Sequence, residues 1–393
     1  MKVNLIIPSF YPATVYGGPI FSTLHTCKSL SELDDIEVYV STTNINGNSR
    51  LDVEKNNWVK FNDYFFVKYY NETMVGKFSF FFFLNVWKDI KFSDVVHLQG
   101  IFSPITPITL IYALIFRKPI LMSPRGNFCE WGLAQGSRFK NIWIKLIVNP
   151  FVSHVSWHAT SEAEKEDILK LYPMSNVYIV PNGVDLNSYS HVNYLTKNMY
   201  TDKYIGKELA PSKTIVSMGR LHKVKRFDIL IKSFVRILNI HPDAILLIAG
   251  KDEGEKANLD TLVEEYNLKN SVYFVGEVSD QNKIDFLGNA DLFVLSSESE
   301  NFGNVYIESL AAGTPIVAST GTPWQEVEGA NCGKWVHNSV EETTKAICQM
   351  LQKDREQMRL NSRKLSQKYD WKNIATQFEK IFKKMIVNKK KRR

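Results

Sequence analysis

The chain has 393 residues, of which 44% are hydrophobic and 23% charged, so it can build two or three folded domains. This composition excludes an intrinsically disordered protein. The formal charge is +7, but residues 383–393 alone hold seven basic side chains and no acidic one. The rest of the chain is therefore balanced, which disfavours a nucleic-acid-binding core.

The lack of a signal-peptide pattern and the spacing of the cysteines favour a cytoplasmic protein. The first apolar run is short and is interrupted by Pro8 and Pro12, which does not fit a secretory signal peptide. The apolar stretch 105–116 is too short to span a bilayer. The four cysteines show no metal-binding spacing, so we expect reduced thiols rather than a zinc site or a disulfide framework.

The first half of the chain alternates predicted strands and helices. Strands are expected at residues 2–10, 36–43, 94–100, 119–126 and 156–161, with an amphipathic helix at 19–33. Alternation at this spacing requires a parallel sheet with crossover helices. We therefore predict an α/β domain over residues 1–180.

Gly17 and Gly18 close the loop after the first predicted strand, and Pro19 suits the first position of the following helix. Glycines let a backbone approach a phosphate without a side chain in the way. An ordinary strand-to-helix turn is the alternative. The sequence is not GxGxxG, so the usual dinucleotide-binding motif is absent.

A second candidate site in this half is an acceptor pocket. Arg125 ends a predicted strand and is followed by Phe128 and Trp131, so a cation and two aromatic rings could edge the pocket. Packing with one surface arginine is the alternative. His97 is expected near the end of another strand at the same rim, where a satisfied structural polar group is the alternative to catalysis.

The strand and helix pattern restarts in the second half. Strands are expected at residues 213–221, 244–250, 271–276, 290–297 and 314–319, which predicts a second α/β domain over residues 181–370. Residues 371–393 are expected to form a final helix, packed back toward the N-terminal domain, with a basic tail. The apolar face of this helix would hold Trp371, Ile374, Phe378, Ile381 and Phe382.

Two charged motifs follow predicted strands of the second half. Glu300 lies in a loop after one strand, and Glu308 lies on the helix that the loop opens, so the two carboxylates flank a helix N-terminus suited to an anion. Arg220 and Lys225 follow another strand and could converge on one diphosphate. A solvated basic loop is the alternative for the second motif.

The segments "YGGP", "GRLHKVKRFD" and "ENFGNVYIESLAAGTPIVAS" together resemble retaining glycosyltransferases of family 4 with the GT-B fold. The resemblance implies an α/β protein of two Rossmann-like domains with parallel sheets that face across a cleft. The N-terminal domain would bind the acceptor and the C-terminal domain the nucleotide sugar. It also implies no metal and no cofactor beyond the UDP- or GDP-sugar donor.

Residue roles follow from the resemblance position by position. Glu300 matches the glutamate that contacts the donor sugar, and Glu308 matches the one that holds the ribose hydroxyls. Arg220 and Lys225 match the pair that neutralises the leaving diphosphate, so the expected catalytic set is Arg220, Lys225 and Glu300. The remaining donor-binding positions are Phe302, Gly303 and Asn304, which would offer backbone donors, and Gly17 and Gly18. Arg125 stands where many relatives carry a histidine.

The expected activity is transfer of a hexose or N-acetylhexosamine to a lipid-linked saccharide, in the synthesis of a lipopolysaccharide O-chain, capsule or exopolysaccharide. The expected partners are the nucleotide sugar, this acceptor and an anionic membrane surface, with no nucleic acid. The aromatic segment 77–92 and the basic tail 389–393 favour a peripheral position on the inner face of the cytoplasmic membrane. A core-facing crossover helix is the alternative for the aromatic segment. The alternative functions are a nucleotide-sugar epimerase or hydrolase and a non-catalytic sugar-nucleotide sensor.

Overall fold

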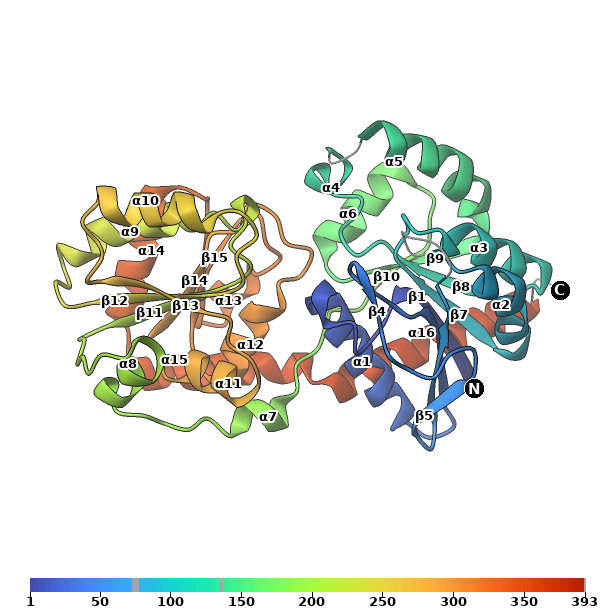
Figure 1. The fold of residues 1–393 in the computed structure, drawn as a ribbon, viewed down its shortest axis with the longest axis horizontal. Helices are drawn as coiled ribbons and strands as arrows, with labels where there is room; N and C mark the ends of the chain where they lie inside the picture. Colours follow the sequence, from blue (N-terminus) through green and yellow to red (C-terminus); the bar gives the residue numbers. More distant parts are fainter. Residues whose placement is uncertain (73–77, 135–136, 392–393) are drawn as a thin grey trace. The chain divides into compact units, whose positions relative to one another are not determined.

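The computed structural model of the chain describes residues 1–72, 78–134 and 137–391. It divides into two units, one formed by residues 1–183 with 371–393 and the other by residues 184–370. Each unit is built on its own sheet with helices on both faces (Figure 1). The α/β class with two parallel-sheet domains is therefore confirmed.

The first unit holds a sheet in the order β10-β9-β8-β7-β1-β2-β6-β5. All neighbouring pairs are parallel except β5 and β6, which form an antiparallel edge that the sequence analysis did not predict. The strands are β1 (Lys2–Ser9), β2 (Glu37–Thr43), β5 (Trp58–Asn62), β6 (Phe65–Tyr70), β7 (Val95–Gln99), β8 (Ile120–Ser123), β9 (Val155–Ala159) and β10 (Val177–Ile179), with a separate hairpin of β3 (Ile45–Asn46) and β4 (Ser49–Arg50).

The helices of the first unit cover the two faces of this sheet. They are α1 (Gly18–Ser31), α2 (Phe80–Phe92), α3 (Ile105–Ile115), α4 (Glu130–Ala134), α5 (Ser137–Trp143), α6 (Glu162–Leu171) and α16 (Trp371–Lys391), with short turns η1 (Thr14–Tyr16), η2 (Ile144–Val148) and η3 (Asn149–His154). Side chains alternate along a strand, so Leu5 of β1 packs with α1 and α16, whereas Ile6 packs with α2 and α3. Figure 1 shows these two helical layers.

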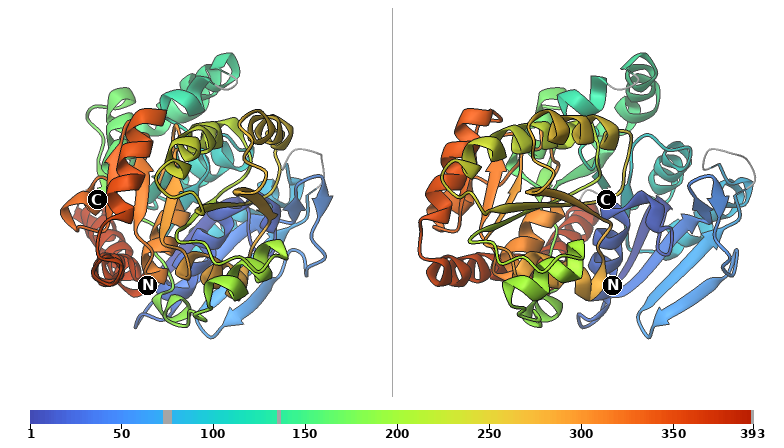
Figure 2. Two further views of the ribbon diagram at one scale, coloured as in Figure 1. Left: turned by 90° about the vertical axis from the view of Figure 1, so that its left-hand side faces the viewer. Right: turned by 60° about the vertical axis from the view of Figure 1, so that its left-hand side comes forward.

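The second unit holds a parallel sheet in the order β13-β12-β11-β14-β15-β16. Its strands are β11 (Thr214–Met218), β12 (Ile245–Ala249), β13 (Val272–Gly276), β14 (Leu292–Leu295), β15 (Ile316–Ser319) and β16 (Gly333–Val336). The views in Figure 2 bring this sheet toward the viewer, between two layers of helices.

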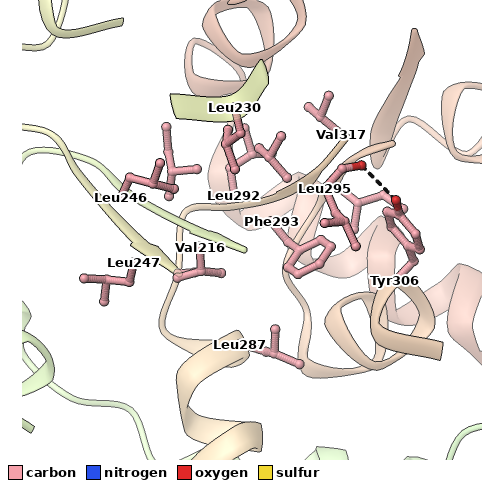
Figure 3. Close-up of a cluster of buried hydrophobic side chains, with 14 of the residues drawn as sticks. Val216, Leu230, Leu246, Leu247, Leu287, Leu292, Phe293, Leu295, Tyr306 and Val317 are labelled. Carbon is pink, nitrogen blue, oxygen red and sulfur yellow. Dashed lines mark hydrogen bonds between the residues drawn. The ribbon is translucent and has the colours of Figure 1, made fainter. Parts of the chain in front are cut away.

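Two helical layers enclose the core of the second unit. The helices are α7 (Leu186–Ser190), α8 (Lys197–Ile205), α9 (Phe227–Leu238), α10 (Lys256–Glu265), α11 (Asp280–Gly288), α12 (Asn304–Ala312), α13 (Glu326–Gly329), α14 (Val340–Leu351) and α15 (Arg355–Ser366), with turns η4 (Lys223–Lys225) and η5 (Gln367–Tyr369). Figure 3 shows Leu230 of α9 near Leu292 of β14, and Tyr306 of α12 beside Phe293 of the same strand. These side chains are fully buried, so they fix both helices against the strands that lead to the candidate site.

The helix α16 follows the second unit in sequence but belongs to the first. Its apolar face packs with α1 and with β1, β2 and β7, and Phe378 is 2% exposed. The Phe378 ring lies 5.0 Å from the His158 ring and 5.5 Å from the His97 ring. The expected apolar stripe is therefore the surface that closes this core.

We predict that Phe378→Ala lowers the free energy of unfolding of the first unit by about 3 to 5 kcal/mol, because a buried ring is lost and a cavity remains. Denaturant unfolding would measure the change. The matched control is Val387→Ala on the same helix, where the side chain is 49% exposed and the expected change is within about 0.5 kcal/mol. Equal midpoints for both variants would contradict this packing.

Candidate functional site

The order of strands reverses beside β11 in the second unit, because the chain moves outward through β12 and β13 and then returns to the other side at β14. The loops that follow β11 and β14 therefore lie next to each other at the carboxyl edge of the sheet. Glu298 of the second loop donates its backbone N–H to the carbonyl of Val224 in the first, over 2.8 Å. A ligand-binding crevice is expected at this edge.

An ion pair joins the two loops. Lys225 Nζ donates to Glu300 Oε1, and Ser297 Oγ donates to the same oxygen over 2.7 Å. Both charged side chains are 13% exposed. Charge-assisted bonds at a site with little water are stronger than at an open surface, so the lysine ammonium is held in a fixed place.

The helix α12 opens directly beyond Glu300, and its start requires a glycine. Gly303 caps the helix with φ +78°, and a β-carbon there would lie 2.6 Å from the Tyr306 ring. Phe302 turns its ring inward, and its carbonyl accepts the indole N–H of Trp324 over 2.7 Å. Backbone N–H groups at a helix start have no intrahelical acceptor, so Asn304 begins an end that attracts anions.

The predicted order of strand, loop, helix and strand is confirmed for residues 292–319. The Tyr306 hydroxyl donates to the Leu295 carbonyl over 2.8 Å and ties α12 to β14 (Figure 3). Burial raises the pKa of Tyr306 well above its usual value, and the nearby Glu300 carboxylate raises it further. Tyr306 therefore stays a neutral donor and fixes the helix beside the ion pair.

The other two predicted charges of this unit have their own ion pairs. Glu308 on α12 accepts from Lys283 Nζ of α11 over 2.8 Å. Arg220 Nη1 donates to Glu253 over 2.7 Å, and the Arg220 side chain is 62% exposed. The structure thus brings Lys225 and Glu300 together and gives Arg220 and Glu308 separate partners.

In the first unit, Gly17 and Gly18 lie where the chain leaves η1 and enters α1. Gly17 has φ +66°, a left-handed backbone conformation that residues other than glycine rarely adopt. A β-carbon on Gly17 would meet no atom within 4 Å, so the glycine is needed for its backbone angle rather than for space. No acidic residue lies in the first turn of α1, which leaves that helix end suited to an anion.

The expected position of His97 at the sheet rim is wrong, because β7 continues to Gln99 and His97 is fully buried in its middle. His97 Nε2 contacts Ser123 Oγ at 2.8 Å, and Ser123 Oγ contacts His158 Nδ1 at 2.7 Å. Burial lowers the pKa of His97 well below its usual value, and that of His158 to about 3. Both rings are therefore neutral groups of the core.

Arg125 lies two residues beyond β8 and is partly buried. Its Nε and Nη2 donate to Gln99 Oε1 over 3.3 and 3.0 Å, and its Nη1 donates to Asn182 Oδ1 over 2.9 Å. Burial lowers the pKa of Arg125, yet a guanidinium stays protonated in proteins. The sequence analysis missed Gln99 and Asn182, although Gln99 lies next to the end of a predicted strand.

The two expected aromatic edges of the acceptor pocket differ from each other. Trp131 belongs to α4 and is 41% exposed. Phe128 is 3% exposed, and its ring lies 5.5 Å from the Trp157 ring. Phe128 is thus a core residue rather than a pocket edge, because the chain after Arg125 turns its apolar ring onto β9.

An open hollow of about 910 Å³ lies elsewhere in the first unit. Its lining includes Pro119 and Ile120 at the start of β8 and Val155 at the start of β9, with Met385 of α16. These are the amino ends of the strands, whereas ligands of such sheets bind at the carboxyl ends. We therefore place the candidate site at the strand ends described above.

The described ranges, residues 1–72, 78–134 and 137–391, hold neither a metal-ligand cluster nor a membrane-spanning helix. Within them, no group of three or more His, Cys, Asp or Glu side chains could hold a metal ion. In those same ranges, no helix has the length and apolar character to cross a bilayer.

Two family models match the chain. Residues 16–188 match the model described as Glycosyltransferase Family 4, and residues 202–366 match the model described as Glycosyl transferases group 1. The two matches cover most of both units.

Curated relatives share parts of the sequence. Mannosylfructose-phosphate synthase of Agrobacterium fabrum is 33% identical over 41% of this chain and 37% of its own length. A D-inositol 3-phosphate glycosyltransferase of Corynebacterium aurimucosum is 28% identical over 56% of this chain and 54% of the relative. The GDP-mannose:cellobiosyl-diphosphopolyprenol alpha-mannosyltransferase of Xanthomonas campestris is 24% identical over 74% of this chain and 73% of its own length. The matches to the first two relatives thus span about half of their length or less.

Solved structures share the fold. Anabaena HepE, crystallised with UDP, is 17% identical with a TM-score of 0.74 over 98% of this chain and 100% of its own. WaaG, a glycosyltransferase involved in lipopolysaccharide biosynthesis, is 16% identical with a TM-score of 0.69 over 97% of this chain and 99% of its own. Both are glycosyltransferases of the GT-B type, with the same two α/β domains. This chain therefore belongs to glycosyltransferase family 4 and has the GT-B fold.

Proposed function

We propose that the chain is a retaining, metal-independent hexosyltransferase that moves a hexose or N-acetylhexosamine from a UDP- or GDP-sugar onto a lipid-linked saccharide. The observation that carries this proposal is the fixed Lys225–Glu300 pair beside the start of α12. A cation and a helix N-terminus at one strand edge are suited to the diphosphate of a nucleotide sugar. Two relatives support the donor class: HepE structures hold UDP and UDP-glucose, and the Xanthomonas enzyme is named for GDP-mannose.

The proposed roles follow the growth of charge during transfer. When the bond between the sugar and the diphosphate breaks, negative charge develops on the leaving phosphate oxygen. Lys225 and the start of α12 stabilise that charge, and Arg220 adds a second cation from the same loop as Lys225. Glu300 orients the Lys225 ammonium and contacts the donor sugar, whereas Glu308, held by Lys283, binds the ribose hydroxyls.

The proposed acceptor and pathway rest on named relatives and on one surface of the first unit. The Xanthomonas relative carries a polyprenol-linked acceptor in its name, and WaaG acts in lipopolysaccharide biosynthesis. We assign this chain to the assembly of an O-chain, capsule or exopolysaccharide on a lipid carrier. An epimerase or hydrolase would release or rearrange the sugar without an acceptor, and a sensor would bind the donor without turnover.

The aromatic segment provides a membrane-facing surface. Phe82, Val86 and Ile90 of α2 face the core, so the segment is a crossover helix. The same helix exposes five large apolar side chains, and the neighbouring α3 and η2 expose more; these are Phe80, Phe81, Phe83, Leu84, Phe92, Ile111, Leu114, Ile115 and Leu146. The core-facing crossover helix is therefore confirmed for one face, and the exposed face supports the proposed membrane contact. Lys77, Arg392 and Arg393 lie outside the described residues.

The donor site is tested by Lys225→Ala. The variant is expected to lose about 100-fold to 1000-fold in the rate of transfer, because one preorganised cation is removed. The readout is UDP or GDP release from a panel of nucleotide sugars with a lipid-linked saccharide extract. Lys223→Ala is the matched control, since Lys223 is an exposed lysine of the same turn and should retain nearly the wild-type rate.

Two further variants complete this test. Arg220→Ala should lose rate to a similar degree, and Glu300→Gln keeps the shape of the pair but removes its negative charge. Near-normal turnover by Lys225→Ala with an unchanged melting temperature would contradict the assignment. Nucleotide release that needs no acceptor would favour the hydrolase.

Metal independence predicts that transfer continues in excess EDTA, because Lys225, Arg220 and α12 supply the positive charge that a divalent ion would otherwise provide. The same assay measures it, and the anomeric proton coupling of the product is expected to match that of the donor sugar. Loss of activity that Mg²⁺ or Mn²⁺ restores would overturn the first expectation, and an inverted anomer would overturn the second.

Membrane association is tested by co-sedimentation with anionic liposomes. A chain that ends at Asn388 should bind more weakly than the full chain at low salt, because each basic side chain near the surface contributes about 1 kcal/mol. Phe83→Ser should weaken binding at high salt, since insertion of apolar rings is not screened. The control is Tyr266→Ser, an aromatic of the second unit that is 42% exposed. Failure of the full chain to sediment would remove the membrane from the proposal.

A further inference from the structure

A polar cluster in the first unit lies where that sheet reverses its strand order. β1 pairs with β2 on one side and with β7 on the other, so the loops after β1 and β7 meet at the carboxyl edge. Thr23 of α1 donates to Gln99 Oε1 over 2.9 Å and joins this helix to the end of β7. This edge is the position at which open parallel sheets bind ligands.

The positive charge of Arg125 has neutral partners in this cluster. Its hydrogen bonds go to the amide oxygens of Gln99 and Asn182. Among the ion pairs within 4.0 Å found over the described residues, none involves Arg125. A partly buried guanidinium without a carboxylate is costly, because amide oxygens satisfy its donors but do not compensate its charge.

The carboxylate of Glu164 acts on the Arg125 charge, but its oxygens are hydrogen-bonded to other groups. Glu164 Oε1 accepts the Gly126 N–H over 2.7 Å, and its Oε2 accepts the N–H and the hydroxyl of Thr160 over 2.7 and 2.9 Å. The carboxylate therefore holds the Arg125 loop in place from the side of α6. It stabilises the cation only from a distance and leaves its charge available to a ligand.

The orientation of the Gln99 amide leaves its Nε2 without a hydrogen-bond acceptor among the described residues. Its Oε1 takes the Thr23 hydroxyl and two Arg125 N–H groups, which fixes the amide with its oxygen toward those donors. Gln99 is 1% exposed, and its Nε2 is a buried donor for which the described part of the chain provides no acceptor. An unsatisfied buried donor is unfavourable, so the cluster lacks both a negative charge and an acceptor atom.

The histidines next to this cluster add no charge. His158 Nε2 faces the Val180 carbonyl at 2.8 Å and must donate to it, so its Nδ1 accepts from Ser123. Ser123 then accepts from His97 Nε2, which makes both rings neutral tautomers. Arg125 is therefore the charged group that an incoming ligand meets at this edge.

We infer that Arg125, positioned by Gln99 and Asn182, binds an oxyanion, a carboxylate or phosphate group, of the sugar substrate. Arg125 is partly exposed as a residue, and its guanidinium has two N–H groups beyond the three already used. The ligand would supply the negative charge that the chain itself does not place beside Arg125. The inference rests on the proposed function for its choice of a sugar, and the anion belongs either to the acceptor or to the transferred sugar.

Binding measurements on the full chain test this without turnover. Titration calorimetry at low salt would compare glucose 6-phosphate with glucose for the acceptor source, and UDP-glucuronate with UDP-glucose for the donor source. Wild type is expected to prefer the charged member of one pair by about tenfold or more, since a hydrogen-bonded charge is worth at least that factor. The pair that shows the preference identifies the source.

The decisive variant is Gln99→Glu, which has nearly the same shape and places a carboxylate against the guanidinium. It should keep the fold and lose the preference for the charged probe. Arg125→Gln should lose the preference as well, whereas Lys223→Ala, at an exposed lysine of the second unit, should keep it. An unchanged preference in Gln99→Glu, or no charge preference in the wild type for either pair, would overturn the inference. These outcomes do not depend on catalytic activity, so they are separate from a failure of the proposed function.

Discussion

Right-handed crossovers place every connecting loop of a parallel sheet at one of two edges, and a crevice opens only where neighbouring connections leave for opposite faces. Both units obey this constraint, at β11 and β14 in one and at β1 and β7 in the other. The polar groups that the structure brings together lie at these two reversals. Lys225 and Glu300 meet at the first, and Arg125 and Gln99 meet at the second. The position of the chemistry thus follows from chain topology before any side chain is considered.

The cations at the two reversals have different kinds of partner. Lys225 is paired with a carboxylate, so the ligand-free chain holds a neutral pair at that edge. A buried pair of this kind adds little net stability, because desolvation of both charges offsets their attraction. Its value lies in holding an ammonium group in place with little water around it. Arg125 is held by neutral amides, so its charge remains available. Both cations are therefore held in place, but only the charge of Lys225 is compensated by a carboxylate.

Sequence patterns predicted the fold class and the order of elements around Glu300, because strand periodicity and the Asn-Phe-Gly-Asn loop are local signals. They did not predict that Lys283 would hold Glu308 or that Glu253 would hold Arg220, since these partners come from other elements. His97 was misplaced because the end of β7 lies two residues further on, and a shift of that size separates a rim from a core. Gln99 was recognisable only as a polar residue near the end of its predicted strand.

The discontinuity of the first unit has a consequence for its biosynthesis. Its core includes α16, which begins at residue 371, after the whole of the second unit at 184–370. A ribosome adding about 5 to 20 residues per second needs on the order of 10 to 40 seconds to translate the intervening chain. During that interval the face of α1 that later receives Phe378 and Phe382 has no covering helix. The second unit, which is continuous in sequence, can complete its core first, and the first unit must then finish folding when α16 leaves the exit tunnel.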